Sequence, residues 1–103
     1  MESYKEMIQQ KWDRYRAGVP YMLEPFDPNA DEDEQQVRFL IELVRALVRL
    51  PEDERLTEST GFNDQTGMLT LVKAKYPEND FFNVDIPCTI DGIAAWLEAG
   101  QPW

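Results

Sequence analysis

The pattern of apolar and polar positions predicts a helix near the start of the chain. Ser3 followed by Glu6 matches a capping box, in which each side chain bonds a free backbone N–H group. Apolar residues then recur at helical spacing on one face: Tyr4, Met7, Ile8, Trp12 and Tyr15. Gly18 is suited to the left-handed position after a last turn, and Pro20 cannot continue a helix. We therefore expect this helix to end before Gly18 and a proline-containing connector to span residues 19–30.

The second predicted helix is apolar around most of its circumference. Asn29 or Asp31 can cap it, and acidic residues fill its first turn, where the helix dipole favours negative charge. Two adjoining faces are apolar, one with Val37, Leu40, Ile41, Val44, Leu47 and Val48, the other with Phe39, Leu43, Ala46 and Leu50. Such a helix is normally central and covered on several sides. The alternative is that one side is left free for a second copy or another partner. Pro51 ends this helix.

The segment from residue 68 to residue 86 has no clear period. As a helix, Leu69, Val72 and Tyr76 share a face, whereas the strand alternation is poor because Lys73 falls on the side of the two leucines. We expect a helix over residues 68–76, and a short strand or an extended loop over residues 81–86. Thr89 then caps a last helix that runs to about Ala99.

The pattern as a whole predicts a mainly α fold. We expect one domain over residues 1–103, with four helices and a central, apolar second helix. Two antiparallel strands within residues 68–86 are the alternative, and they would make the protein α+β.

The composition narrows the classes of partner. The chain has 20 acidic and 10 basic residues and no histidine, for a net charge of -10. Such a protein repels nucleic acid and anionic membranes, so we predict neither as a partner. No apolar run approaches the roughly 20 residues that span a bilayer. The N-terminus lacks the basic and apolar regions of a signal peptide, so we expect a cytoplasmic protein.

Candidate chemistry is sparse. Cys88 has no histidine to act as its base, and Ser3 and Ser59 have no base either, so we predict a protein without enzymatic activity or cofactor. Asp27, Asn29 and Asp31 occupy positions 1, 3 and 5 of an EF-hand pattern. The pattern then fails, because position 6 is Glu32 where the turn needs glycine and position 12 is Arg38 where a bidentate glutamate is needed. We expect no metal site.

The segment Tyr76–Pro87 combines aromatic and acidic side chains without any base. Aromatic residues anchor protein interfaces, and charges set the choice of partner and the rate of encounter. An acidic rim around such anchors suits a basic protein surface. The alternative is that Phe81, Phe82, Val84 and Ile86 alternate into the core. The predicted partner-binding residues are those of this segment and the acidic start of the second helix: Tyr76, Glu78, Asp80, Phe81, Asp85, Asp31, Glu32, Asp33 and Glu34.

The same features resemble the immunity proteins of colicin-type and pyocin-type nuclease bacteriocins. The shared features are an acid-rich start of the second helix, Tyr76-Pro77 followed by acids, Pro87, and Gly92-Ile93 before Trp96 in the last helix. The likeness covers residues 31–98, its motifs are short, and Lys75-Tyr76 stands where the family has paired tyrosines. The resemblance implies a four-helix cytosolic protein that silences a basic DNase. It also implies that Tyr76 is an anchor and that Glu78 and Asp80 are acidic contacts.

The predicted function is therefore inhibition of a basic protein such as a nuclease, by charge complementarity and steric block. Two alternatives remain. One is a phage-encoded antagonist of a host defence complex, in which the acidic protein mimics nucleic acid. The other is a regulatory or assembly subunit that forms a homodimer or larger homo-oligomer through the second helix.

Overall fold

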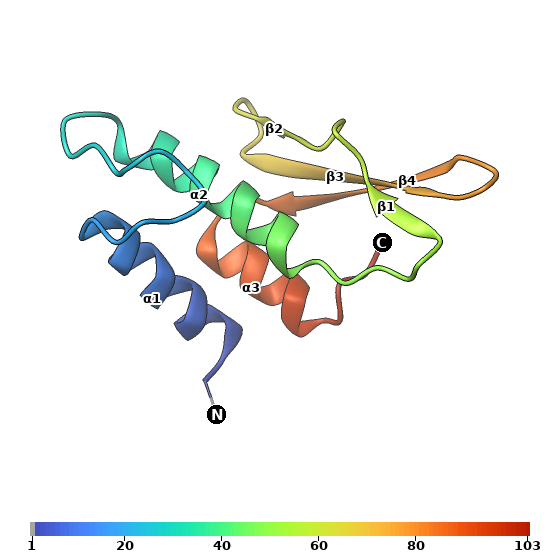
Figure 1. The fold of residues 1–103 in the computed structure, drawn as a ribbon, viewed down its shortest axis with the longest axis horizontal. Helices are drawn as coiled ribbons and strands as arrows, with labels where there is room; N and C mark the ends of the chain where they lie inside the picture. The colour runs from blue at the N-terminus through green and yellow to red at the C-terminus, as the bar shows by residue number, and fades with distance from the viewer. Residues whose placement is uncertain (1) are drawn as a thin grey trace.

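The computed structural model describes residues 2–103, which form an α+β fold (Figure 1). These residues contain three helices and a four-stranded antiparallel sheet. In chain order the elements are α1 (Tyr4–Arg16), α2 (Glu32–Leu47), β1 (Glu54–Leu56), β2 (Gly61–Asn63), β3 (Met68–Lys75), β4 (Asp80–Pro87) and α3 (Ile90–Glu98).

The prediction of a mainly α, four-helix protein is wrong. The residues expected to form a helix over 68–76 form strand β3, and the residues 81–86 lie within β4. The arrangement found is the α+β alternative, with eight residues in each strand of the hairpin. The four-helix fold implied by the resemblance to nuclease immunity proteins is therefore not the fold of this chain.

Tertiary contacts explain why the strand forms despite its poor alternation. Leu69 and Leu71 are both fully buried on one face of β3, as the strand pattern requires. Lys73 lies on the same face, but its ammonium group is 2.8 Å from the Glu54 carboxylate and 4.7 Å from the centre of the Trp103 ring. Lys73 therefore occupies a core-facing position with its charge compensated.

The helix ends follow the local sequence closely. Ser3 Oγ accepts a hydrogen bond from the Glu6 N–H at 3.1 Å, and Asp31 accepts one from the Asp33 N–H at 2.9 Å. Thr89 caps α3 by accepting from the Gly92 N–H at 2.9 Å. Gly18 adopts a positive φ of 99°. These predicted helix ends are confirmed, whereas α2 ends at Leu47 rather than at Pro51.

Strand β3 lies in the middle of the sheet. Along one side it pairs with β4 over its whole length, from Met68 opposite Pro87 to Lys75 opposite Asp80. Along the other side it pairs first with β2 and then with β1, each only three residues long. Between these two short strands, the Thr57 N–H donates to the Val72 carbonyl oxygen at 2.8 Å.

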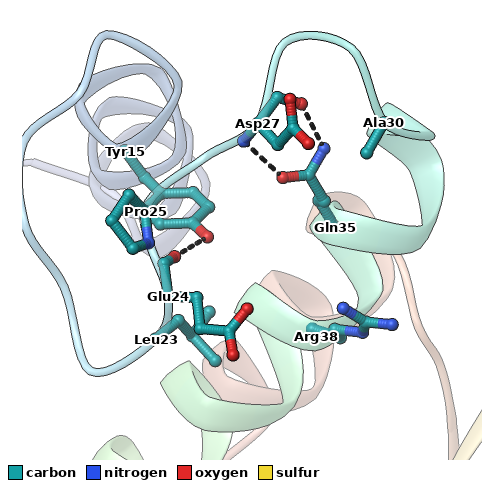
Figure 2. A pocket seen from close by; sticks show the side chains of 8 residues that line it. All are labelled: Tyr15, Leu23, Glu24, Pro25, Asp27, Ala30, Gln35 and Arg38. Atoms are coloured by element: carbon teal, nitrogen blue, oxygen red, sulfur yellow. Dashed lines mark hydrogen bonds between the residues drawn. The ribbon is translucent and has the colours of Figure 1, made fainter.

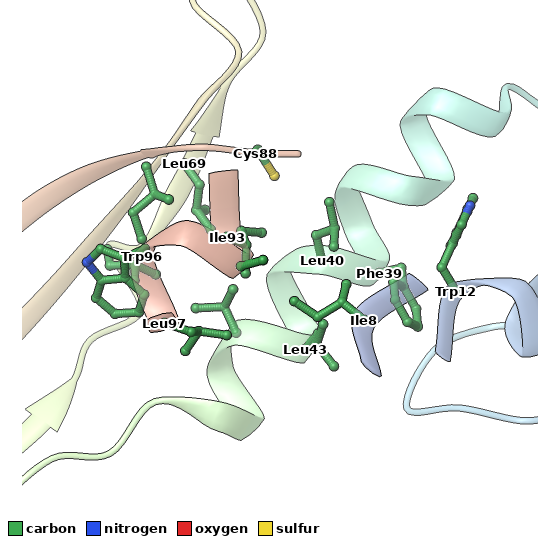
Figure 3. Packing of buried hydrophobic residues seen from close by; sticks show 14 of the residues in the cluster. Ile8, Trp12, Phe39, Leu40, Leu43, Leu69, Cys88, Ile93, Trp96 and Leu97 are labelled. Carbon is green, nitrogen blue, oxygen red and sulfur yellow. The ribbon is translucent and has the colours of Figure 1, made fainter. Parts of the chain in front are cut away.

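The core lies between the helices and one face of the sheet (Figure 3). The sheet contributes Leu69, Leu71 and Ile86, and α3 contributes Ile93, Trp96 and Leu97. The helix α2 supplies Phe39, Leu40, Leu43 and Val44, which are all buried. The helix predicted to be central and apolar therefore buries one face in the core, although Ala46, which was predicted to lie on an apolar face, is exposed. The opposite face of the sheet carries Thr70, Phe81, Asn83 and Asp85.

Candidate protein-binding site

Exposed aromatic side chains gather where β3 turns into β4. Within residues 2–103, the large hydrophobic side chains that are exposed are Tyr4, Val19, Met22, Phe62, Tyr76, Phe81 and Phe82. Three of these seven belong to residues 76–82, which we call the hairpin end. Phe81 is the most exposed of all, at 67%. Apolar side chains that cluster on a surface mark interaction sites, whereas scattered ones carry no such meaning.

The strand geometry explains why these rings stay outside the core. Phe81 lies opposite Ala74 and Phe82 lies opposite Lys73, so the two rings point to opposite faces of the sheet. Ile86 is buried and Val84 is half-buried, but exposure increases toward the turn, and Phe82 is already 44% exposed. The interpretation that all four apolar residues of this segment alternate into the core therefore fails for Phe81 and Phe82.

The free charges at the hairpin end are mainly acidic. The Tyr76 N–H donates to the Asp53 carbonyl oxygen at 2.7 Å, so residues 52–54 lie beside the hairpin end. The two lysines of β3 lie near acids there: the Lys73 ammonium is 2.8 Å from the Glu54 carboxylate, and the Lys75 ammonium is 4.0 Å from the Asp53 carboxylate. Among the described residues, Glu52, Glu78 and Asp80 form no ion pair, and neither does Arg55.

Asp85 lies further along β4, beyond the hairpin end. Its carboxylate accepts a hydrogen bond from the Thr70 hydroxyl at 2.5 Å, across the ladder between β3 and β4. The side chain is exposed on the face of the sheet opposite the core. Asp85 therefore shares a strand with the hairpin end but has a partner within the chain.

The acidic start of α2 is far from the hairpin end. In Figure 1 the first turn of α2 and the turn between β3 and β4 lie at opposite ends of the long axis. Three of its four acids have contacts within the chain. Asp31 caps the helix, Glu32 lies 2.9 Å from Arg16, and Glu34 lies 2.6 Å from Arg38. Asp33 is exposed and forms no ion pair with any residue of 2–103. The structure thus separates the two groups of predicted binding residues.

Reasoning from the sequence missed the approach of residues 52–54 to the hairpin end. The acids there are visible in the sequence, but their neighbours depend on the pairing of β1 with β3. One signal was present: opposite charges lie close across two strands once a strand is assumed over residues 68–75, because Glu54 is opposite Lys75 and diagonal to Lys73. The helix assignment concealed that signal.

A cleft of about 380 Å³ lies between the connector, α1 and α2 (Figure 2). Several of its polar groups are bonded to one another. The Tyr15 hydroxyl donates to the Glu24 carbonyl oxygen at 2.5 Å. The Gln35 side chain accepts from the Asp27 N–H and donates to the Asp27 carbonyl oxygen, both at 2.8 Å. These bonds hold the connector to the two helices, and the Arg38 guanidinium at the cleft lies 2.6 Å from the Glu34 carboxylate.

The chemistry of the remaining polar side chains is limited. Burial raises the pKa of the Cys88 thiol to about 11, so it stays protonated at neutral pH and is a poor nucleophile. Burial, together with the nearby Glu42 carboxylate, raises the pKa of Tyr21 above its ordinary value. Within residues 2–103, no three Asp, Glu or Cys side chains converge where they could hold a metal ion.

Comparisons with protein-family models, with curated proteins and with solved structures find no match to this chain. In the part of the chain that the structure describes, no helix has the length and apolar character needed to cross a bilayer. The assignment of a function therefore depends on the geometry of the hairpin end.

Proposed function

We propose that this protein is a non-enzymatic inhibitor that binds a basic protein, such as a nuclease, through the hairpin end. One observation carries the proposal: Tyr76, Phe81 and Phe82 are exposed at the same end of the sheet, with Phe81 and Phe82 on its two opposite faces, and the neighbouring Glu78 and Asp80 have no ion-pair partner among the described residues. Exposed rings supply the area that interface hot spots bury, and free carboxylates favour a basic partner.

The proposed inhibition combines charge complementarity with steric block. A nucleic-acid-binding surface is basic because it neutralises phosphates. The carboxylates of Glu78 and Asp80 would occupy phosphate positions on that surface, while the aromatic rings exclude water beside them. The same mechanism serves an immunity protein that silences a nuclease and a phage-encoded antagonist that mimics nucleic acid. In both roles the inhibitor acts in the cytoplasm, where its target meets nucleic acid.

A homo-oligomer through α2 has less support. None of the exposed large hydrophobic side chains belongs to that helix. Its apolar residues other than Ala46 instead pack against the core of the same chain, either fully or in part. A stable homodimer interface is usually large and more apolar than the rest of the surface.

The proposal is tested by titrating the protein against a panel of basic nucleases, with binding and nuclease activity measured together. We expect saturating protein to abolish the activity of the target, and the affinity to fall as the salt concentration rises. Binding without inhibition would show that the protein is not an inhibitor. An affinity that is independent of salt would contradict the proposed charge complementarity.

Paired variants locate the binding site. We expect Glu78→Gln with Asp80→Asn to weaken binding by about tenfold, and Asp33→Asn with Glu34→Gln at the other end of the molecule to change it much less. If the α2 variant has the larger effect, the site lies at the start of α2.

The aromatic anchors are tested against exposed apolar residues elsewhere. Tyr76→Ala with Phe81→Ala should cost at least about 2 kcal/mol, or roughly thirtyfold in affinity. The matched control, Val19→Ala with Met22→Ala, also removes exposed apolar surface but lies in the segment after α1. Equal effects of the two double variants would rule out the hairpin end as the anchor.

A further inference from the structure

One side of β4 is an open sheet edge. Among residues 2–103, β4 pairs only with β3, and no other strand pairs with its far side. The opposite edge of the sheet consists of the two three-residue strands β1 and β2, a short and interrupted edge that is hard to extend. In contrast, β4 runs without interruption for eight residues. A long, regular edge is a template for another strand.

The ladder shows which backbone groups face the open edge. The Cys88 N–H donates to the Gly67 carbonyl oxygen at 2.9 Å, just beyond the pair Met68 and Pro87. Hydrogen-bonded and non-bonded pairs alternate along an antiparallel ladder, so the bonded residues of β4 are Asp80, Phe82, Val84 and Ile86. The intervening residues Phe81, Asn83 and Asp85 therefore direct their N–H and C=O groups away from β3.

A second hydrogen bond agrees with this assignment. The Thr57 N–H donates to the Val72 carbonyl oxygen, so Val72 directs its backbone toward β1 and β2, not toward β4. Val72 is paired with Asn83, whose backbone must then also point away from β3. Phe81, Asn83 and Asp85 are all exposed, so their outward groups are accessible to a partner.

From this arrangement we infer that β4 binds an extended, basic segment of a partner protein as an added strand. The inference rests on the proposed function, because it names the part of the basic target protein that binds to the open edge of β4. The main chain of Phe81, Asn83 and Asp85 would supply the hydrogen bonds, as in other complexes formed by strand addition. Phe82 and Val84, on the core face, would contact apolar side chains of the added strand.

Charge decides between a basic segment and a second copy of this chain. Asp80 and Asp85 lie on β4 and Glu78 precedes it, whereas no base follows Lys75 in the sequence. Two copies paired through β4 would bring two such acidic strands together, each on a chain of net charge -10. Asp85 lies on the face opposite Phe82 and Val84, so lysine or arginine side chains on that face of the added strand would instead lie beside Asp85, which is favourable.

The inference is tested with a short synthetic peptide that alternates valine and lysine, and with a control peptide that alternates valine and glutamate. Amide hydrogen exchange of the labelled protein is measured with and without each peptide. We expect the valine–lysine peptide to slow exchange at Phe81, Asn83 and Asp85. Exchange at Phe82 and Val84 should change little, because their N–H groups are already bonded to β3. The glutamate peptide should bind at least tenfold more weakly.

A proline variant removes one outward donor without touching the ladder to β3. Proline is tolerated on an edge strand where its missing N–H faces solvent, so Asn83→Pro should keep the hairpin. We expect Asn83→Pro to weaken binding of the valine–lysine peptide at least tenfold, which corresponds to about 1.4 kcal/mol. The matched control Asn83→Ala keeps the N–H and should bind nearly as the unmodified protein does. If Asn83→Pro does not fold, the exchange pattern of the unmodified protein decides.

Several results would overturn the inference. One is amide exchange at Phe81, Asn83 and Asp85 that does not change when the valine–lysine peptide is added. Another is equal affinity of the Asn83→Pro and Asn83→Ala variants for that peptide. A third is equal affinity of the unmodified protein for the two peptides. A dimer whose outward amides are already protected without peptide would assign the edge to a second copy. If a basic nuclease binds both variants equally, the proposed function stands and the edge inference fails. If the peptide binds as expected but no basic protein does, the edge inference stands and the proposed function fails.

Discussion

Replacing Gly92 with alanine tests how tightly α3 is joined to the end of β4. Gly92 lies in the first turn of α3, where a methyl group on its Cα would come 2.4 Å from the Pro87 carbonyl oxygen and 2.7 Å from the Pro87 Cβ. Carbon contacts are most favourable at about 3.5–4.0 Å, so the chain would have to shift by roughly 1 Å. Because the nearest atom belongs to the backbone, a side-chain rotation cannot relieve the contact.

The expected magnitude follows from three terms. Overpacking of this kind typically costs about 1–3 kcal/mol. The shift would also weaken the hydrogen bond from the Gly92 N–H to Thr89 Oγ1, now 2.9 Å long, which is part of a cap worth about 1 kcal/mol. Alanine recovers about 1 kcal/mol because its helix propensity exceeds that of glycine. The sum is a loss of about 2 kcal/mol in the free energy of unfolding for Gly92→Ala.

Urea denaturation followed by tryptophan fluorescence measures this difference, and thermal unfolding should show a Tm lower by about 8–16 °C. The control is Ala95→Gly, an exposed position of the same helix, where only propensity acts and the loss should be about 1 kcal/mol. If Gly92→Ala instead raises the free energy of unfolding by about 1 kcal/mol, helix propensity alone accounts for the effect of the substitution. The close approach of α3 to Pro87 would then be refuted.

The remaining predictions concern the core, the Lys73 ion pair and Cys88. Leu40→Ala should lower the free energy of unfolding by about 2–5 kcal/mol without changing the urea m-value, because Leu40 is fully buried in the shared core. Glu54→Gln should cost about 1–3 kcal/mol, because it leaves Lys73, whose side chain is only 12% exposed, without its carboxylate; the added change Lys73→Met should recover most of this loss. Because burial raises the pKa of Cys88 from 9.0 to about 11, the folded protein holds this proton more tightly than the unfolded chain does. Its contribution to stability should be complete below pH 9 and be lost between pH 9 and about 11, and Cys88→Ala should remove this part of the pH dependence, as measured by urea denaturation across that range. The burial of Leu40 would be contradicted if Leu40→Ala were as stable as the original protein. The role of the ion pair would be contradicted if Lys73→Met did not recover stability in the Glu54→Gln variant. The role of Cys88 would be contradicted if Cys88→Ala left the pH dependence unaltered.

The candidate site was only partly predictable from the sequence. The combination of aromatic and acidic residues in Tyr76–Pro87 is a local property and could be found without the fold. That Phe81 and Phe82 remain exposed depends on how far the hairpin extends past the core, which no local pattern contains. The acidic start of α2 was grouped with them on charge alone, yet the fold places it at the opposite end of the molecule (Figure 1).

The sequence by itself determined where the helices begin. Ser3, Asp31 and Thr89 cap their helices through bonds to N–H groups two or three residues away, so the signal and the structure lie within the same few residues. Only the tertiary structure decided that residues 68–87 form a hairpin. The strand pattern there requires Lys73 on the buried face, and its charge is tolerated because Glu54 and Trp103, distant in sequence, lie beside it. A preference that depends on such distant partners is absent from the local sequence.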